Sequence, residues 1–148
     1  MKLLIMALLL TSFSANASIF KSLASKMEGT FFNFHTIMVI DHSGEFDDGW
    51  LRVEVEDVIE IKALDKSRIN FELESWFMNA HSCGLDGVAV KKGNKFVYTG
   101  EKDWNGNTCE LEISLDKEKG IVLKDENSAC ASMACGMRGS LDGANFPE

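Results

Sequence analysis

The alternation of apolar and polar residues along most of this chain is the feature that most limits its possible folds. In INFELESWF, residues 69–77, every second residue is apolar except Ser75, and the residues between them are polar or acidic until Trp76. Successive side chains of a β-strand point to opposite faces, so this pattern predicts a strand with one buried face. WLRVEVE, residues 50–56, repeats the pattern, and VIEIKAL is predicted to continue the sheet after a bend near Asp57.

Three more stretches have strand character. In GVAVKKGNKFVYTG, residues 87–100, two valines precede a turn at residues 91–94 and two aromatic residues follow it, which predicts a hairpin. CELEISLDKEKGIVLKD, residues 109–125, predicts a second hairpin around the turn DKEKG. TFFNFHTIMVID, residues 30–41, is the most apolar stretch and is interpreted as a strand covered on both faces.

A helical period occurs in SIFKSLASKME, residues 18–28, where apolar residues recur at near helical spacing before the stop signal Gly29. Elsewhere, turn signals return at intervals of about 8–12 residues. The predicted fold is therefore all-β: an antiparallel β-barrel or curled sandwich of about seven or eight strands, with one short N-terminal helix and two disulfides.

The first 17 residues, MKLLIMALLLTSFSANA, have the layout of a secretory signal peptide. One lysine precedes an apolar run from Leu3 to Leu10, and a small-residue triplet ends at Ala17, the expected cleavage site. The run is much shorter than the roughly 20 residues of a membrane-spanning helix. Ser18, not cysteine, follows the cleavage site, which argues against a lipid anchor. Residues 18–148 are predicted to be a single β domain exported to the periplasm of a Gram-negative cell, or secreted.

The mature chain is predicted to be strongly acidic, which limits its partners. Removing residues 1–17 takes away one lysine of 15 basic residues and none of 23 acidic residues, so 14 remain against 23 and the net charge is −9. Nucleic acid and anionic membranes would repel such a chain, whereas a basic protein would be attracted. The charge predicts a basic protein partner, no nucleic acid and no membrane anchor, or else a solvated domain that makes no use of its charge.

All four cysteines lie in the mature part, and an even number in a small exported chain predicts two disulfides. The second hairpin would bring Cys109 close to Cys130 and leave Cys83 for Cys135. The alternative pairing, Cys130 with Cys135 and Cys83 with Cys109, stays open. A zinc site that combines Cys83 with nearby histidines is disfavoured by the oxidising compartment and by the absence of paired CxxC motifs, so no metal is predicted.

No enzyme signature is present: the chain has no P-loop, GxGxxG, HExxH or GxSxG motif. His81, in NAHSCGLDG, ends a strand, but no nucleophile or acid is spaced to complete a triad with it. The acidic loop at residues 41–49 departs from the EF-hand pattern and is interpreted as a hairpin loop rather than a calcium site. The strand glutamates are expected to solvate the outer face of the sheet. We predict no catalytic residues and no cofactor.

The C-terminal segment CASMACGMRGSLDG, residues 130–143, is the predicted binding element. It is expected to lack regular structure and to be immobilised by its two cross-linked cysteines. Its glycines, Gly139 among them, permit backbone conformations that would expose Arg138, Ser140 and Asp142 to a partner. The alternative is that Arg138 and Asp142 form an internal ion pair that ties the tail to the barrel.

The second half of the mature chain carries the ordered motifs HxC, GxAV, C-x-L-x-I and C-x4-CG-x-RG-x-LDG. They comprise His81, Cys83, Gly87, Ala89, Cys109, Leu111, Ile113, Cys130, Cys135, Gly136, Arg138, Gly139, Leu141, Asp142 and Gly143. The set resembles a group of small exported proteins of Gram-negative bacteria. In overall plan, a disulfide-bonded periplasmic barrel, the chain is also similar to bacterial lysozyme inhibitors and to periplasmic immunity proteins. That resemblance implies a loop inserted into a hydrolase cleft, with Arg138 as its basic residue and Ser140 as its small polar residue.

We therefore predict a non-catalytic periplasmic protein that inhibits or neutralises a cell-wall hydrolase through an acidic surface and the C-terminal loop. One alternative is a carrier of a small or lipidic ligand in the barrel interior; another is a hydrolase centred on His81. Bulky inward residues argue for a filled interior and against the carrier. They are Phe71, Leu73, Phe77, Leu111 and Ile113.

Overall fold

The structure is a computed structural model that describes residues 21–44, 49–136 and 139–147. Within these ranges the chain forms eight strands, two short α-helices and one turn of 3₁₀-helix. The elements in chain order are α1 (Leu23–Met27), β1 (Gly29–Ile40), β2 (Trp50–Ala63), β3 (Arg68–Phe77), the 3₁₀-helix η1 (Met78–Ala80), β4 (His81–Lys92), β5 (Lys95–Lys102), β6 (Thr108–Asp116), β7 (Gly120–Lys124), α2 (Ala129–Ala134) and β8 (Asn145–Phe146). The predicted signal peptide lies outside the described residues.

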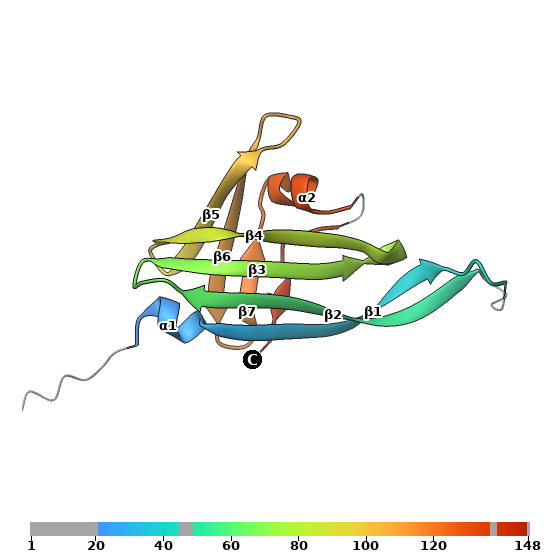
Figure 1. Cartoon of the computed structure of the whole chain (residues 1–148), viewed down its shortest axis with the longest axis horizontal. Helices are drawn as coiled ribbons and strands as arrows, with labels where there is room; N and C mark the ends of the chain where they lie inside the picture. The colour runs from blue at the N-terminus through green and yellow to red at the C-terminus, as the bar shows by residue number, and fades with distance from the viewer. Residues whose placement is uncertain (1–20, 45–48, 137–138, 148) are drawn as a thin grey trace, which may run out of the picture.

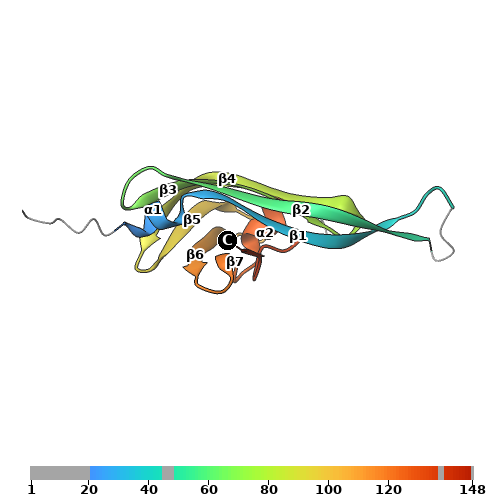
Figure 2. The same ribbon diagram turned by 90° about the horizontal axis from the view of Figure 1, so that it is seen from below.

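The strands form one antiparallel sheet in which each strand pairs with the next along the chain, from β1 to β8. The sheet curls so that β1 and β8 come into contact, giving a nearly closed barrel. Figure 1 shows β1–β4 as one layer, and Figure 2 shows β6 and β7 on its inner side. The predicted all-β antiparallel fold is confirmed. In the described ranges no helix has the length and apolarity to cross a membrane.

Large apolar side chains fill the interior of the barrel. Phe71, Phe96 and Phe146 are almost completely buried, together with aliphatic residues from β2, β3, β6 and β7. Complete burial of one such side chain contributes about 1.5–3 kcal/mol to stability. Of the residues predicted to point inward, Phe77 is only half-buried and packs against this core from its edge.

The N-terminal helix is shorter than the predicted residues 18–28. It spans Leu23–Met27 and begins where the Ser22 hydroxyl accepts the Ser25 N–H at 3.2 Å. Ala24 and Met27 on one face are buried in the core cluster, so the short helix is held by packing.

Two expectations about β1 and β2 are corrected. β1 is not covered on both faces, because Phe32 is 40% and Phe34 is 72% exposed. The reason is that β1 is an edge strand whose outer face has no second layer above it. β2 is one continuous strand rather than two segments joined by a bend, and Asp57 within it is buried.

Asp57 stands where β3 separates from β2. Backbone pairing between these strands runs only from Ala63 to Val58. Beyond it, Asp57 Oδ1 accepts the Trp76 N–H at 2.7 Å. Asp57 Oδ2 also lies 3.0 Å from His35 Nε2, within ion-pair distance but without hydrogen-bond alignment. The buried Asp57 carboxylate thus replaces one of the backbone hydrogen bonds that β2 and β3 no longer make to each other.

Past this point β1 and β2 continue as a two-stranded ribbon, which we call the arm: residues 34–40 and 50–56. Its register is unbroken, from Phe34 opposite Glu56 to Ile40 opposite Trp50. Figures 1 and 2 both show the arm extending beyond the ends of the other strands. η1 contacts β1, and Ile37 on the arm is buried.

The disulfides are Cys83–Cys135 and Cys109–Cys130, the first of the two pairings considered. They join the two ends of the α2 region to β4 and β6. Because all four cysteines are oxidised, none can ligate zinc as a thiolate. Across the described ranges, no three His, Cys, Asp or Glu side chains converge as metal ligands.

Candidate binding surfaces

The C-terminal segment is more regular than predicted. Its first part forms α2, so the expectation of a segment without regular structure is wrong for Cys130–Ala134. The cause is a buried carboxylate upstream: Asp125 accepts the backbone N–H groups of Cys130 at 3.3 Å and Ala131 at 2.8 Å. These bonds satisfy donors that the helix itself leaves free. Sequence reasoning missed Asp125, although an acid shortly before a small-residue run is a usable signal.

Two glycines of the segment are required by close packing. A Cβ on Gly139 would lie 2.5 Å from Cys135 Cβ and 2.7 Å from Cys83 Sγ, on the disulfide itself. A Cβ on Gly136 would lie 2.6 Å from His81 Nδ1. The prediction that these glycines serve special backbone conformations is therefore corrected to a requirement for space. The original prediction, of a special backbone conformation, is confirmed for Gly143, whose φ is +78°.

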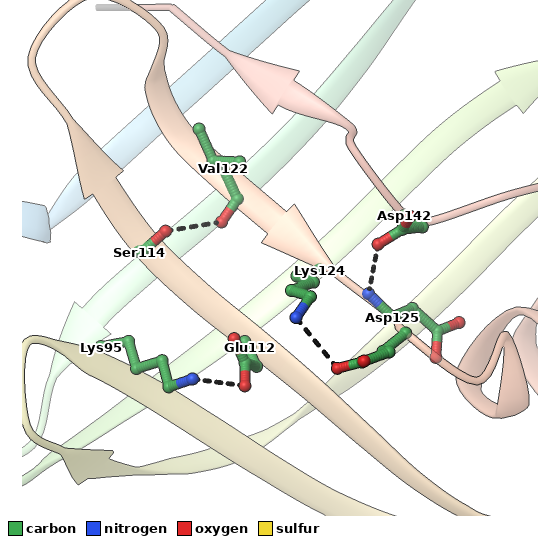
Figure 3. Close-up of polar contacts among 8 residues, drawn as sticks. Lys95, Glu112, Ser114, Val122, Lys124, Asp125 and Asp142 are labelled. Carbon is green, nitrogen blue, oxygen red and sulfur yellow. Dashed lines mark hydrogen bonds and ion pairs between the residues drawn. The ribbon is translucent and has the colours of Figure 1, made fainter.

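The predicted binding residues are separated by the structure. Arg138 lies outside the described residues, and with it the proposed ion pair to Asp142. Ser140 is exposed. Asp142 is also exposed, but its Oδ1 accepts the Asp125 N–H at 3.1 Å, as Figure 3 shows. Asp142 thus ties the segment to the end of β7.

Exposed Trp104 stands beside α2. It is 78% exposed and lines a shallow hollow of about 370 Å³ together with residues of α2, Gly136 and Gly139. The turn that carries it is fixed by Asp103, which accepts the N–H groups of Asn105 at 2.9 Å and Asn107 at 2.8 Å. Burial raises the pKa of Asp103, but these hydrogen bonds outweigh it and leave the pKa below its ordinary value. The other two tryptophans, Trp50 and Trp76, are half-buried.

A second surface lies on the outer face of β2–β4. The sheet register places Glu60 directly opposite Glu72, and Glu72 directly opposite Asp86. Three carboxylates therefore form one row across three strands, all exposed. Like charges directly opposite each other destabilise a sheet, by roughly 0.2–1 kcal/mol per pair on the scale of cross-strand effects.

Further carboxylates extend this row. Glu74 follows on β3, and Glu56 and Glu54 continue along β2 on the same face. We call the six residues the acidic face: Glu54, Glu56, Glu60, Glu72, Glu74 and Asp86. The ion pairs found among the described residues all lie elsewhere. The glutamates were expected only to solvate the sheet; their alignment was not visible from the sequence.

The acidic face is hollowed at its centre. Next to the carboxylate row, Val58 and Gly84 flank Glu74 and line a depression of about 380 Å³, where Gly84 has no side chain to fill the space. Its lining combines apolar atoms with the carboxylates of Glu60 and Glu72. A lysine or arginine side chain suits such a site, because its apolar stem can pack while its charged head meets carboxylates.

An aromatic pair borders the acidic face on β1. Phe32 lies opposite Val58 and Phe34 opposite Glu56, so both rings share the outer face. The rings stack with centroids 6.2 Å apart and planes inclined by 22°. Exposed aromatic residues beside charged ones are typical of residues that anchor a protein partner.

His81 is the residue on which the hydrolase alternative was centred. It begins β4 half-buried and packs against Gly136. No hydrogen bond or ion pair joins His81 to an acid in the part of the chain that the structure describes.

The fold and these surfaces define a disulfide-bonded antiparallel β-barrel with one acidic, aromatic-bordered sheet face. Comparison with protein-family models, curated proteins and solved structures yields no match to this chain. The interpretation of the surfaces therefore depends on their own geometry.

Proposed function

We propose that this protein is a non-catalytic periplasmic binding protein that inhibits or neutralises a basic cell-wall hydrolase. The observation that carries the proposal is the in-register row Glu60–Glu72–Asp86. Opposed carboxylates that form no ion pair within the described part of the chain lower the stability of the free protein, and a basic partner would relieve that repulsion. The negative electrostatic potential of these carboxylates would also accelerate association with such a partner.

The partner would use two kinds of contact. Basic side chains would enter the hollow beside Glu74, and the partner's apolar surface would cover Phe32 and Phe34. Trp104 and Ser140 would provide a further contact region at the C-terminal segment, to which the resemblance alone assigns Arg138. The restriction to a cell-wall hydrolase follows from the resemblance in plan to lysozyme inhibitors and immunity proteins, and from predicted export.

The test uses the oxidised mature protein and two charge variants. The triple variant Glu60→Gln, Glu72→Gln, Glu74→Gln removes three charges from the acidic face. The matched control Glu101→Gln, Glu110→Gln, Glu118→Gln removes three charges from exposed sites elsewhere. Basic muramidases and amidases retained from envelope extracts would be assayed for inhibition by each protein.

We expect the acidic-face variant to bind at least about tenfold more weakly, equivalent to roughly 1.4 kcal/mol. The control should change affinity much less, because its charges lie outside the acidic face. Equal losses for both variants would mean that only net charge matters. Retention of no hydrolase by the wild type would overturn the proposal.

A further inference from the structure

The two disulfides of this protein differ in their exposure. Cys109 and Cys130 are both completely buried. Cys135 is half-buried and lines the shallow hollow beside Trp104, whereas its partner Cys83 is completely buried. A disulfide is reduced when a thiolate reaches one of its sulfur atoms. In the folded protein, such a thiolate has a route to Cys135 but none to the buried Cys109–Cys130 pair.

The floor of the hollow lies against the Cys83–Cys135 disulfide. Gly136 and Gly139 line the hollow together with Cys135. A Cβ on Gly139 would lie 2.7 Å from Cys83 Sγ and 3.1 Å from Cys135 Sγ. Because residue 139 has no side chain in this space, the hollow leads from the surface to Cys135.

A buried hydroxyl group stands on the other side of Cys83. The register of β3 and β4 places Ser75 directly opposite Cys83, and an isolated bridge joins Cys83 to Cys135, so Cys83 lies between these two residues. Ser75 is 1% and Cys83 is 0% exposed, so both side chains point into the barrel. Side chains directly opposite each other have Cβ atoms about 4.5–5.5 Å apart.

The Ser75 hydroxyl has no use in the oxidised protein. Its Oγ is buried and has no hydrogen-bond partner in the part of the chain that the structure describes. A buried polar group without a partner lowers stability, and such groups in folded proteins call for a specific explanation, of which a redox role is one.

We propose that the Cys83–Cys135 disulfide is a redox modification site that a dithiol reduces, and that Ser75 assists this reduction. A thiolate of the dithiol attacks Cys135 Sγ from the hollow and forms a mixed disulfide with it. The bond between the two protein sulfurs breaks, and Cys83 Sγ leaves with the electron pair as a thiolate. The Ser75 hydroxyl donates a hydrogen bond to this sulfur, and a stabilised thiolate is a faster leaving group.

The second thiol of the dithiol completes the reaction. After it loses its proton, it attacks the sulfur of the reductant in the mixed disulfide, and Cys135 Sγ leaves as a thiolate. Both protein thiolates then take up protons. In total, two electrons and two protons pass from the dithiol to the protein, and the dithiol becomes a disulfide.

Reduction releases one end of the C-terminal segment. Cys135 loses its covalent link to β4, while Cys109–Cys130 still joins α2 to β6. Buried Leu141 continues to hold the far end of the segment. The reaction uses no carboxylate of the acidic face, so this inference does not depend on the proposed hydrolase binding, and each can fail without the other.

The test is reduction of the folded, oxidised mature protein by dithiothreitol, at neutral pH and below the unfolding temperature. Rapid alkylation with N-ethylmaleimide and peptide mass spectrometry give the initial rate for each disulfide. Cys109–Cys130 is the internal reference, because a route through global unfolding exposes both disulfides. Ser75→Ala removes the hydroxyl. Ser114→Ala is the matched control, a strand serine that lies opposite Lys95 rather than a cysteine.

We expect Cys83–Cys135 to be reduced at least about tenfold faster than Cys109–Cys130 in the wild type and in Ser114→Ala. In Ser75→Ala the ratio of the two rates should fall at least about fivefold, because the Cys83 thiolate loses a charge-assisted hydrogen bond. The thermal unfolding temperature of oxidised Ser75→Ala should not fall, since an unpartnered hydroxyl is removed. Equal rates for the two disulfides would overturn the modification site, and an unchanged ratio in Ser75→Ala would overturn the role of Ser75.

Discussion

At several positions of this protein, the side chain that can be accommodated depends on the atoms that pack against it. Gly139 is the sharpest example, because the Cys83–Cys135 disulfide occupies the space of a side chain. Gly84, also on the β4 side of the molecule, has open space for 4 Å around the position that a Cβ would take, and so tolerates a side chain. The sequence shows both only as glycines in strand or loop segments, and their difference depends on contacts between distant parts of the chain.

The substitution Gly139→Ala is expected to lower the free energy of unfolding by about 1–3 kcal/mol, since the added methyl overlaps the disulfide. Gly84→Ala should change it by well under about 1 kcal/mol or stabilise slightly. Denaturant unfolding of the oxidised proteins measures both. Equal effects would show that the close approach at Gly139 is absent in solution.

Asp65 is expected to make stability depend on pH. Its carboxylate accepts the Ser67 hydroxyl and N–H and the Arg68 Nε–H, each at 2.8 Å, which lowers its pKa from 3.8 to about 2. A lowered pKa means that folding favours the ionised form. The stabilisation is present above the ordinary pKa and is lost as pH falls from about 4 through 2.

Asp65→Asn should therefore lower stability at neutral pH and have little effect near pH 2, where the wild-type carboxylate is largely protonated. Thermal unfolding across this range, with an NMR titration of the Asp65 carboxyl group, tests the effect. A variant whose deficit stays constant down to the lowest pH would contradict it.

At the scale of elements, the strands were predictable and the second helix was not. Alternation is a local property that already appears within nine residues, as in residues 69–77. α2 forms because Asp125 satisfies its first N–H groups and two disulfides hold it, and neither is visible in a periodicity. The exposed face of β1 was also missed, because an apolar strand looks the same at an edge as in the centre of a sheet.

Asp125→Ala is expected to cost about 1–3 kcal/mol, because two backbone donors lose a buried acceptor. Asp142→Ala removes only the exposed acceptor of the Asp125 N–H and should cost less, about 0.5–1.5 kcal/mol. Hydrogen exchange of the α2 amides, combined with denaturant unfolding, distinguishes the two. Comparable losses would show that Asp142, not Asp125, organises the segment.

At the scale of the whole molecule, the disulfides constrain chain segments of different length. Cys83 and Cys135 are 52 residues apart, and Cys109 and Cys130 are 21 apart. On loop-closure entropy alone, removing the first costs about 4 kcal/mol and removing the second about 3 kcal/mol. We expect Cys83→Ser, Cys135→Ser to unfold at lower denaturant than Cys109→Ser, Cys130→Ser, and the reverse order would show that local packing outweighs loop length.

By itself, the sequence determined the strand-rich class, the filled interior and the net charge, because period and composition are local or additive properties. It left two cysteine pairings open, and the structure decided between them. Export and hydrolase inhibition stay predictions. Only the tertiary structure decided that Glu60, Glu72 and Asp86 share one row, that Gly139 lies on a disulfide, and that β1 is an edge strand paired only with β2. Each of these depends on strand register and order. Register and order arise from packing between segments far apart in the chain, so no single stretch of sequence contains them.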